Sequence, residues 1–378
     1  MKKRIAFLVQ GARGGLYGAE KATVQLAGAL AARGHAVRIW RLRETRGAGE
    51  GSDPMGAAIR EAGIDLRDID IAGRASPAAA KRIGEEVEAW GADVLHTTGY
   101  KSDVHGWWAS AKGTRPFALV AIVHGWLFRG DWREWLYYRA DLATLRRFDR
   151  VVVLSAFYER LLRRKGFDPR QLARIPTGIA SFPDDEDCRA LWTHGGPFTF
   201  GVLGRLSEEK NPFLVLQAAK RLVKIRRRDP SGWRIVFAGD GPLRKALERK
   251  AERMGLAGKV AFEGVTDSGR FFRSVHVLVQ TSNVENRPMS LLEAAAWGRS
   301  AIVTKAGGMP EIVADGYAGR VVAKGDAKAL AEAMDGYLTE PAKARMDGTW
   351  ARRHALAEWS FADTLSAFEG LYATLPRR

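Results

Sequence analysis

Residues 282–294 read Ser282-Asn283-Val284-Glu285-Asn286-Arg287-Pro288-Met289-Ser290-Leu291-Leu292-Glu293-Ala294. The stretch follows the apolar run 275–279, which predicts a buried strand, and precedes small residues that end at Gly298. Pro288 predicts the start of a helix, because the first helical position tolerates a missing N–H. Glu285 is therefore expected in the loop before the helix. Glu293 is expected about 7.5 Å along the helix axis.

This arrangement favours a particular kind of ligand. The free N–H groups of a first helical turn attract an anion. A carboxylate accepts hydrogen bonds from two neighbouring hydroxyls at once. Two carboxylates with helix N–H groups between them therefore suit a phosphate-bearing ligand that has hydroxyl groups at both ends.

The stretch resembles the glutamate-x7-glutamate motif of the GT-B glycosyltransferases, in the large retaining family 4 (glycosyltransferase group 1). The spacing alone is a weak signal, but the surroundings are similar too. An alanine-rich helix, the strand-like segment Ser300–Thr304 and the loop Gly307-Gly308 follow in the order that the family shows. Two positions depart from the usual motif, since Asn286 replaces a glycine and Arg287 replaces an apolar residue.

Length and composition indicate folded domains. The 378 residues suffice for two domains, and a hydrophobic fraction of 46% with 12 tryptophans argues against disorder. The single cysteine, Cys188, excludes an internal disulfide and is consistent with the cytosol. The apolar run 5–9 is too short for a signal peptide and predicts a strand. No apolar run approaches the length of a membrane span.

The net charge of +17 favours an anionic partner, which is a nucleotide, an acidic lipid surface or a nucleic acid. The alternative is a basic, soluble enzyme whose positive charge does not indicate an anionic partner. Residues 129–174 concentrate the charge, with 12 Lys and Arg against 6 Asp and Glu. Cations and aromatic rings together suit a lipid headgroup interface, unless the rings belong to the core. The aromatic residues in and beside this region are Trp126, Phe128, Trp132, Trp135, Tyr137, Tyr138, Phe148, Phe157 and Tyr158.

Strand-like runs alternate with helical stretches throughout, which predicts parallel sheets with crossover helices. Two series of runs predict an α/β protein of two doubly wound, Rossmann-like domains that face a central cleft. The expected strands are 5–9, 37–42, 94–97, 119–124 and 151–155, then 198–203, 235–238, 260–262, 275–279, 301–304 and 321–323. We expect domains at 1–180 and 195–356. The resemblance implies that the tail, 357–378, packs back on the first domain.

Two cations follow the first strand of the second domain. Arg205 offers several N–H donors in a planar fork, and Lys210 offers a compact positive charge, so both suit phosphate. The alternative interpretation is that both side chains are solvated cations on a loop. The loop is similar to the family's Gly-Arg…Lys element, which acts on the diphosphate in place of a metal. Asp240 matches a second family element on the base-binding side, or it caps a helix.

The first domain carries weaker signals. The loop with Gly15 and Gly18 follows the first strand and is similar to the family's early Gly-Gly-Ala-Glu element. His124 ends the fourth strand, where the family places a histidine that contacts the transferred sugar; a structural histidine is the alternative. Asp68-Ile69-Asp70 is a D-x-D triplet, and we interpret it as a surface turn.

The resemblance implies a retaining, metal-independent glycosyltransferase that moves a hexose-type sugar from a UDP- or GDP-sugar. The implied acceptor is a glycan or a lipid-linked acceptor in cell-envelope polysaccharide or glycolipid synthesis. The enzyme is expected in the cytoplasm, peripheral on the inner face of the membrane. The expected catalytic residues are His124, Arg205, Lys210 and Glu285. The expected donor-binding residues are Gly15, Gly18, Gly204, Asp240, Asn286, Arg287, Pro288, Met289, Ser290, Leu291 and Glu293. No cofactor or metal site is expected. The alternatives are a GT-B sugar-nucleotide epimerase and a basic nucleic-acid-binding protein, although no recognisable nucleic-acid module is present.

Overall fold

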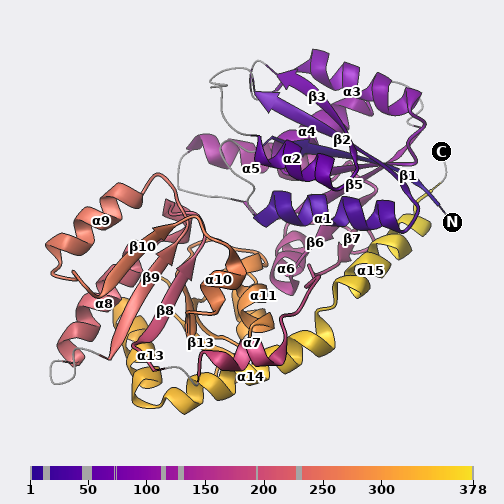
Figure 1. The fold of residues 1–378 in the computed structure, drawn as a ribbon. Coiled ribbons are helices and arrows are strands. Elements are labelled where there is room, and N and C mark those ends of the chain that lie inside the picture. The colour runs from indigo at the N-terminus through magenta and orange to yellow at the C-terminus, as the bar shows by residue number, and fades with distance from the viewer. Residues whose placement is uncertain are drawn as a thin grey trace. The chain divides into compact units, whose positions relative to one another are not determined.

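The computed structural model describes residues 2–11, 18–44, 53–71, 73, 75–111, 116–126, 132–192, 195–226 and 232–376. The chain forms two compact units, drawn in Figure 1. One unit combines Met1–Thr177 with Ala362–Arg378, and the other is Gly178–Phe361. Each is a parallel sheet with helices on both faces, which confirms the predicted α/β class with two Rossmann-like units.

The sheet of the first unit has seven strands in the order β3-β2-β1-β4-β5-β6-β7. They are β1 (Arg4–Gln10), β2 (Ala36–Glu44), β3 (Asp65–Ile71), β4 (Val94–Thr98), β5 (Ala118–Val123), β6 (Arg150–Val153) and β7 (Leu172–Arg174). Its helices are α1 (Gly18–Ala32), α2 (Pro54–Glu61), α3 (Pro77–Ala89), α4 (Tyr100–Ala109), α5 (Trp132–Leu145), α6 (Ala156–Arg164) and α15 (Phe361–Ala373). The strand order reverses between β1 and β4.

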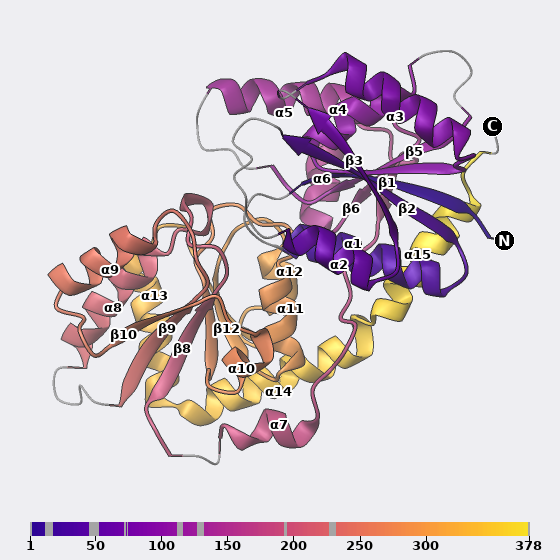
Figure 2. The ribbon, with the colours of Figure 1, turned by 45° about the horizontal axis from the view of Figure 1, so that its top comes forward.

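Two helical layers cover this sheet because its strands bury both faces. On β1, Phe7 packs in the core beside α1, α2 and α15, whereas Leu8 packs in the core beside α3, α5 and α6. Figure 2 shows α1, α2 and α15 on one side of the sheet and α3, α4 and α5 on the other. The C-terminal helix is bonded into the unit, since Tyr372 Oη lies 2.7 Å from Nδ1 of His96.

The sheet of the second unit has six strands in the order β10-β9-β8-β11-β12-β13. They are β8 (Phe198–Leu203), β9 (Trp233–Ala238), β10 (Val260–Gly264), β11 (Val277–Gln280), β12 (Ser300–Thr304) and β13 (Gly319–Val322). The 3₁₀ turn η1 (Glu208–Lys210) follows β8. The helices are α7 (Asp185–Ala190), α8 (Phe213–Ile225), α9 (Arg244–Arg253), α10 (Ser268–Phe272), α11 (Met289–Ala296), α12 (Met309–Val313), α13 (Ala327–Thr339) and α14 (Pro341–Glu358).

The interpretation of Asp68-Ile69-Asp70 as a surface turn is wrong, because the triplet lies within strand β3. Strand β3 pairs in parallel with β2, in a register that sets Asp68 beside Arg41 and Asp70 beside Arg43. Both carboxylates form ion pairs with those arginines, with Nε–Oδ1 distances of 2.7 Å. The strand therefore exists without an apolar run, because buried Ile69 and Ile71 alternate with aspartates that pair with the arginines of β2.

Candidate active site

The expected donor site lies where the strand order of the second sheet reverses. Ligands of doubly wound sheets bind outside the carboxyl ends of the strands at such a reversal. Here it falls between β8 and β11. The loop after β8 carries Gly204, Arg205 and Lys210, and the loop after β11 carries Glu285. Two motifs that are 75 residues apart in the chain thus meet at one point of the sheet.

Lys210 and Glu285 form an ion pair there, through Nζ and Oε1. The same oxygen accepts hydrogen bonds from Gln280 Nε2 at 3.0 Å and from Ser282 Oγ at 3.1 Å. The Glu285 side chain is only 11% exposed, so these donors fix the carboxylate rather than leave it solvated. The sequence predicts both as catalytic residues but does not predict that they form an ion pair.

A second layer of polar side chains holds this arrangement. Ser290 Oγ donates to Gln280 Oε1 at 3.2 Å, and Thr281 Oγ1 bonds to the carbonyl oxygens of Lys210 (3.1 Å) and Asn211 (2.9 Å). The sequence analysis missed Gln280, Thr281 and Ser282 as site residues. Their one signal is position, since they are polar residues at the carboxyl end of a buried strand.

Helix α11 begins one residue later than the sequence predicts. Pro288 has φ −69° and ψ 130°, so it is extended and precedes the helix as its N-cap, and Met289 is the first helical residue. Glu293 is therefore the fifth residue of α11 and is half-buried. Asn286 and Leu291 are each 2% exposed and hold the loop and the helix in the core. The first-turn N–H groups of α11 begin four residues after Glu285.

Glycines let these loops approach each other closely. Gly239 has φ +133°, and a Cβ atom there would lie 2.0 Å from the carbonyl oxygen of Gly204. Gly307 has φ +52°, and its Cβ would lie 1.6 Å from the carbonyl oxygen of Glu285. Both positions therefore require glycine, for conformation and for space. Asp240 is exposed and accepts from the N–H of Gly241 at 2.7 Å; it is not the N-cap of α9, which is Leu243.

The side chain of Arg287 contacts an aromatic ring. Its guanidinium carbon lies 5.0 Å from the ring centroid of Trp359, which follows α14. Burial lowers the pKa of Arg287 to about 10, and the nearby Glu311 opposes that shift, so the side chain stays charged at neutral pH. This contact is a cation–π interaction.

In the first unit, His124 directly follows β5, as the sequence predicts. Its Nε2 atom is buried and has no hydrogen-bond partner among the residues that the structure describes. Burial lowers the pKa of His124 to about 4, so the imidazole is neutral at pH 7. Gly18 is the first residue of α1, whereas Gly15 lies outside the described residues.

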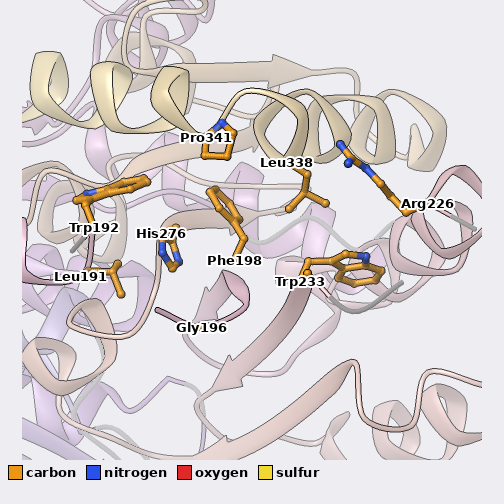
Figure 3. A pocket seen from close by; sticks show the side chains of 10 residues that line it. Leu191, Trp192, Gly196, Phe198, Arg226, Trp233, His276, Leu338 and Pro341 are labelled. Carbon is orange, nitrogen blue, oxygen red and sulfur yellow. The ribbon is translucent and has the colours of Figure 1, made fainter. Parts of the chain in front are cut away.

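A cavity of about 330 Å³ lies at the opposite edge of the second sheet (Figure 3). Phe198 and Trp233, which line it, are the first residues of β8 and β9, so the cavity is at the amino ends of the strands. None of the expected site residues lines it. The motif loops, rather than this cavity, define the candidate site. Within the described ranges, no cluster of three His, Cys, Asp or Glu side chains is suited to a metal.

Comparison with known families identifies the class of protein. The model of the glycosyl transferases group 1 matches residues 185–354, and the model of the glycosyl transferase 4-like domain matches 17–178. The chain belongs to the group 1 glycosyltransferases, and it is a glycosyltransferase with the GT-B fold.

The sequence identity between this chain and individual relatives is low. The D-inositol 3-phosphate glycosyltransferase of Corynebacterium urealyticum is 27% identical over 75% of this chain and 72% of its own length. A GDP-mannose-dependent phosphatidylinositol monomannoside mannosyltransferase of Mycolicibacterium smegmatis is 28% identical over 64% of this chain and 66% of its own. Among solved structures, Anabaena Alr3699/HepE in complex with UDP matches 99% of this chain and 100% of its own, with a TM-score of 0.80 and 19% identity.

Proposed function

We propose that the chain transfers a hexose-type sugar, with retention of anomeric configuration and without a metal. The donor is a UDP- or GDP-sugar, and the acceptor is a glycan or lipid-linked glycan of cell-envelope polysaccharide or glycolipid synthesis. The observation that carries the proposal is the Lys210–Glu285 pair beside the α11 N-terminus, at the strand-order reversal. Similarity to enzymes named for inositol phosphate and phosphatidylinositol mannoside acceptors supports the acceptor class.

Each residue has a role in this proposal. Negative charge grows on the diphosphate as the sugar departs, and Arg205, Lys210 and the first N–H groups of α11 stabilise it. Glu293 holds the ribose hydroxyls, and Glu285 holds hydroxyls of the transferred sugar. We assign neutral His124, whose buried Nε2 has no described partner, to the transferred sugar as well.

The stereochemical outcome tests the proposal. Calorimetry with UDP, GDP, ADP and TDP identifies the base, and a screen of donors with that base identifies the sugar. NMR of the product should then show the donor's anomeric configuration. An inverted anomeric centre would overturn the retaining mechanism, and epimerisation of the donor without an acceptor would favour the epimerase.

Turnover should be insensitive to EDTA. Arg205, Lys210 and the α11 N-terminus supply the positive potential that a divalent cation supplies elsewhere. The carboxylates of Asp68 and Asp70 form ion pairs with arginines of β2. The hydrogen bond from Arg43 keeps the pKa of Asp70 below its ordinary value. Rates with and without EDTA should agree within experimental error. Loss of activity that manganese restores would contradict the metal-independent mechanism.

We further propose that α5 and α6 contact an anionic membrane surface. Four apolar side chains on these helices are at least 40% exposed, namely Trp132, Trp135, Leu136 and Phe157. Arg139 lies over the Trp135 ring at 4.9 Å, and Arg163, Arg164 and Lys165 are exposed beside α6. Phe148 and Tyr158, in contrast, are buried in the core, so they are not part of the proposed membrane-contacting surface. No helix in the described part of the chain is long and apolar enough to cross a bilayer.

Sedimentation with liposomes tests this surface. The protein should sediment with vesicles that contain anionic lipid at low salt and be released at high salt, because exposed charges are screened. Replacing Trp132 and Trp135 by serine, or Arg164 and Lys165 by glutamate, should reduce binding and leave nucleotide affinity unchanged. Failure of the wild-type protein to bind at low salt would show that the acceptor is soluble.

A further inference from the structure

Two carboxyl groups are buried side by side in the first unit. Asp103 on α4 is 2% exposed and Asp141 on α5 is 3% exposed. Thr97, in β4, donates its hydroxyl to Oδ1 of Asp103, and Trp126 donates its indole N–H to Oδ2 of Asp141 at 2.6 Å. The motifs that identify the family include none of these four residues. Buried charged groups of like sign need a physical explanation.

One shared proton provides that explanation. Two neighbouring carboxyl groups that are almost fully buried cannot both be ionised without a large cost, so one of the pair carries a proton. Burial, and then the neighbouring Asp141, raises the pKa of Asp103 well above its ordinary value. Burial raises the pKa of Asp141 to about 6. With both groups ionised, Oδ1 of Asp141 has no donor among the described residues. A proton on Asp103 supplies that donor.

The pair connects the ends of two neighbouring strands of the first sheet, the second of which is followed by His124. Thr97 lies at the carboxyl end of β4, and Trp126 lies two residues after His124, which follows the neighbouring strand β5. The Trp126 ring packs against Tyr138 and Tyr158, with centroid distances of 5.2 and 5.6 Å. A network from Thr97 through both aspartates thus fixes the indole.

We propose that Asp103 and Asp141 form a carboxyl pair with one shared proton that positions Trp126, and through it the His124-Gly125-Trp126 segment, for glycosyl transfer. The inference rests on the proposed role of His124. Asp103, Asp141 and Trp126 are positioning residues, and they act on the transferred sugar through the backbone that carries His124. Cooperative networks of this kind lose most of their effect when any one member is removed.

The decisive comparison is between Asp103→Asn and Asp103→Ala. Asparagine reproduces the protonated acid, because its amide N–H donates to Asp141 and its oxygen accepts from Thr97. We expect its kcat within about twofold of wild type, whereas Asp103→Ala should lose roughly tenfold or more in kcat. Binding of UDP or GDP should be unchanged in both, because Arg205, Lys210 and Glu293, to which we assign the diphosphate and the ribose, lie in the second unit. Equal losses in the two variants would overturn the shared proton.

A double-mutant cycle tests the connection to Trp126. Trp126→Phe keeps an aromatic ring but removes the N–H, so it should lower kcat like Asp103→Ala. The double variant should lose no more than either single variant, since all three break one network. Independent, multiplicative losses would overturn the positioning role.

A measurement that does not depend on catalytic turnover tests this inference separately from the proposed function. The indole N–H signal of Trp126, assigned by its absence in Trp126→Phe, should exchange slowly with solvent in wild type and Asp103→Asn, and at least tenfold faster in Asp103→Ala. Slow exchange in all three would refute the network whether or not transfer is observed. The expected exchange pattern in a protein that transfers no sugar would instead refute the proposed function alone.

Discussion

Lys210→Ala should lower kcat/KM for the sugar nucleotide by about 10²- to 10³-fold, the range for loss of one electrostatic contact to a transition state. The Lys210 side chain is 31% exposed, so its charge is partly desolvated and acts more strongly than a surface cation. Binding of the nucleoside diphosphate, measured by calorimetry, should weaken more than binding of the nucleoside, because the charge meets phosphate.

Two control variants isolate the charge. Lys210→Arg keeps a cation at the position and should retain more activity than alanine. Lys220→Ala removes an exposed lysine from α8 and should leave both affinities unchanged. If wild type and Lys210→Ala bind the diphosphate equally, Lys210 does not meet phosphate and the proposed donor site is wrong.

The ion pair explains how these charges are kept ready without a donor. An unpaired, half-buried charge is costly, and Lys210 and Glu285 neutralise each other at this point of the sheet. Gln280 and Ser282 also bond to the carboxylate, and we propose that they keep these bonds when the lysine turns to phosphate. In our proposal, donor binding exchanges the lysine contact for phosphate and sugar hydroxyls. The site therefore gains charge complementarity without creating a buried, unpaired carboxylate.

Most strands were predictable because buried parallel strands read as continuous apolar runs. The runs near Phe7, Val120 and Phe200 are of this kind, and each forms a central strand. Strand β3 was missed because its outward side chains are charged and pair with β2. Strand β7 was missed because it has three residues, none fully buried. Edge strands depend on partners that sequence patterns do not reveal.

The site was predictable in its motifs but not in its contacts. The family resemblance of two motifs predicts Lys210 and Glu285 as site residues, whereas their pairing depends on the packing of two distant loops. Gln280 has no motif, and its bond to Glu285 follows from the end of β11. Asp103 and Asp141 lie on different helices, so no local pattern could join them.

Glu285→Gln should have the largest effect on turnover, lowering kcat by about 10³-fold while nucleotide affinity changes little. Glutamine keeps the shape and an acceptor oxygen but removes the charge that attracts Lys210 and strengthens hydrogen bonds to sugar hydroxyls. The matched change Glu293→Gln should instead weaken binding of the nucleoside itself, because that carboxylate is assigned to the ribose. Steady-state kinetics and calorimetry on both variants measure the contrast.

Glu332→Gln on the exposed face of α13 is the control for loss of a carboxylate, and it should change neither quantity. The assignment requires that Glu285→Gln lowers kcat and that Glu293→Gln weakens nucleoside binding, since one carboxylate acts on the reacting sugar and the other on the bound nucleoside. A Glu285→Gln enzyme with wild-type kcat and weakened nucleoside binding would reverse the orientation of the donor. The sugar would then lie beside Glu293, and the positive groups of the β8 loop would require a different role.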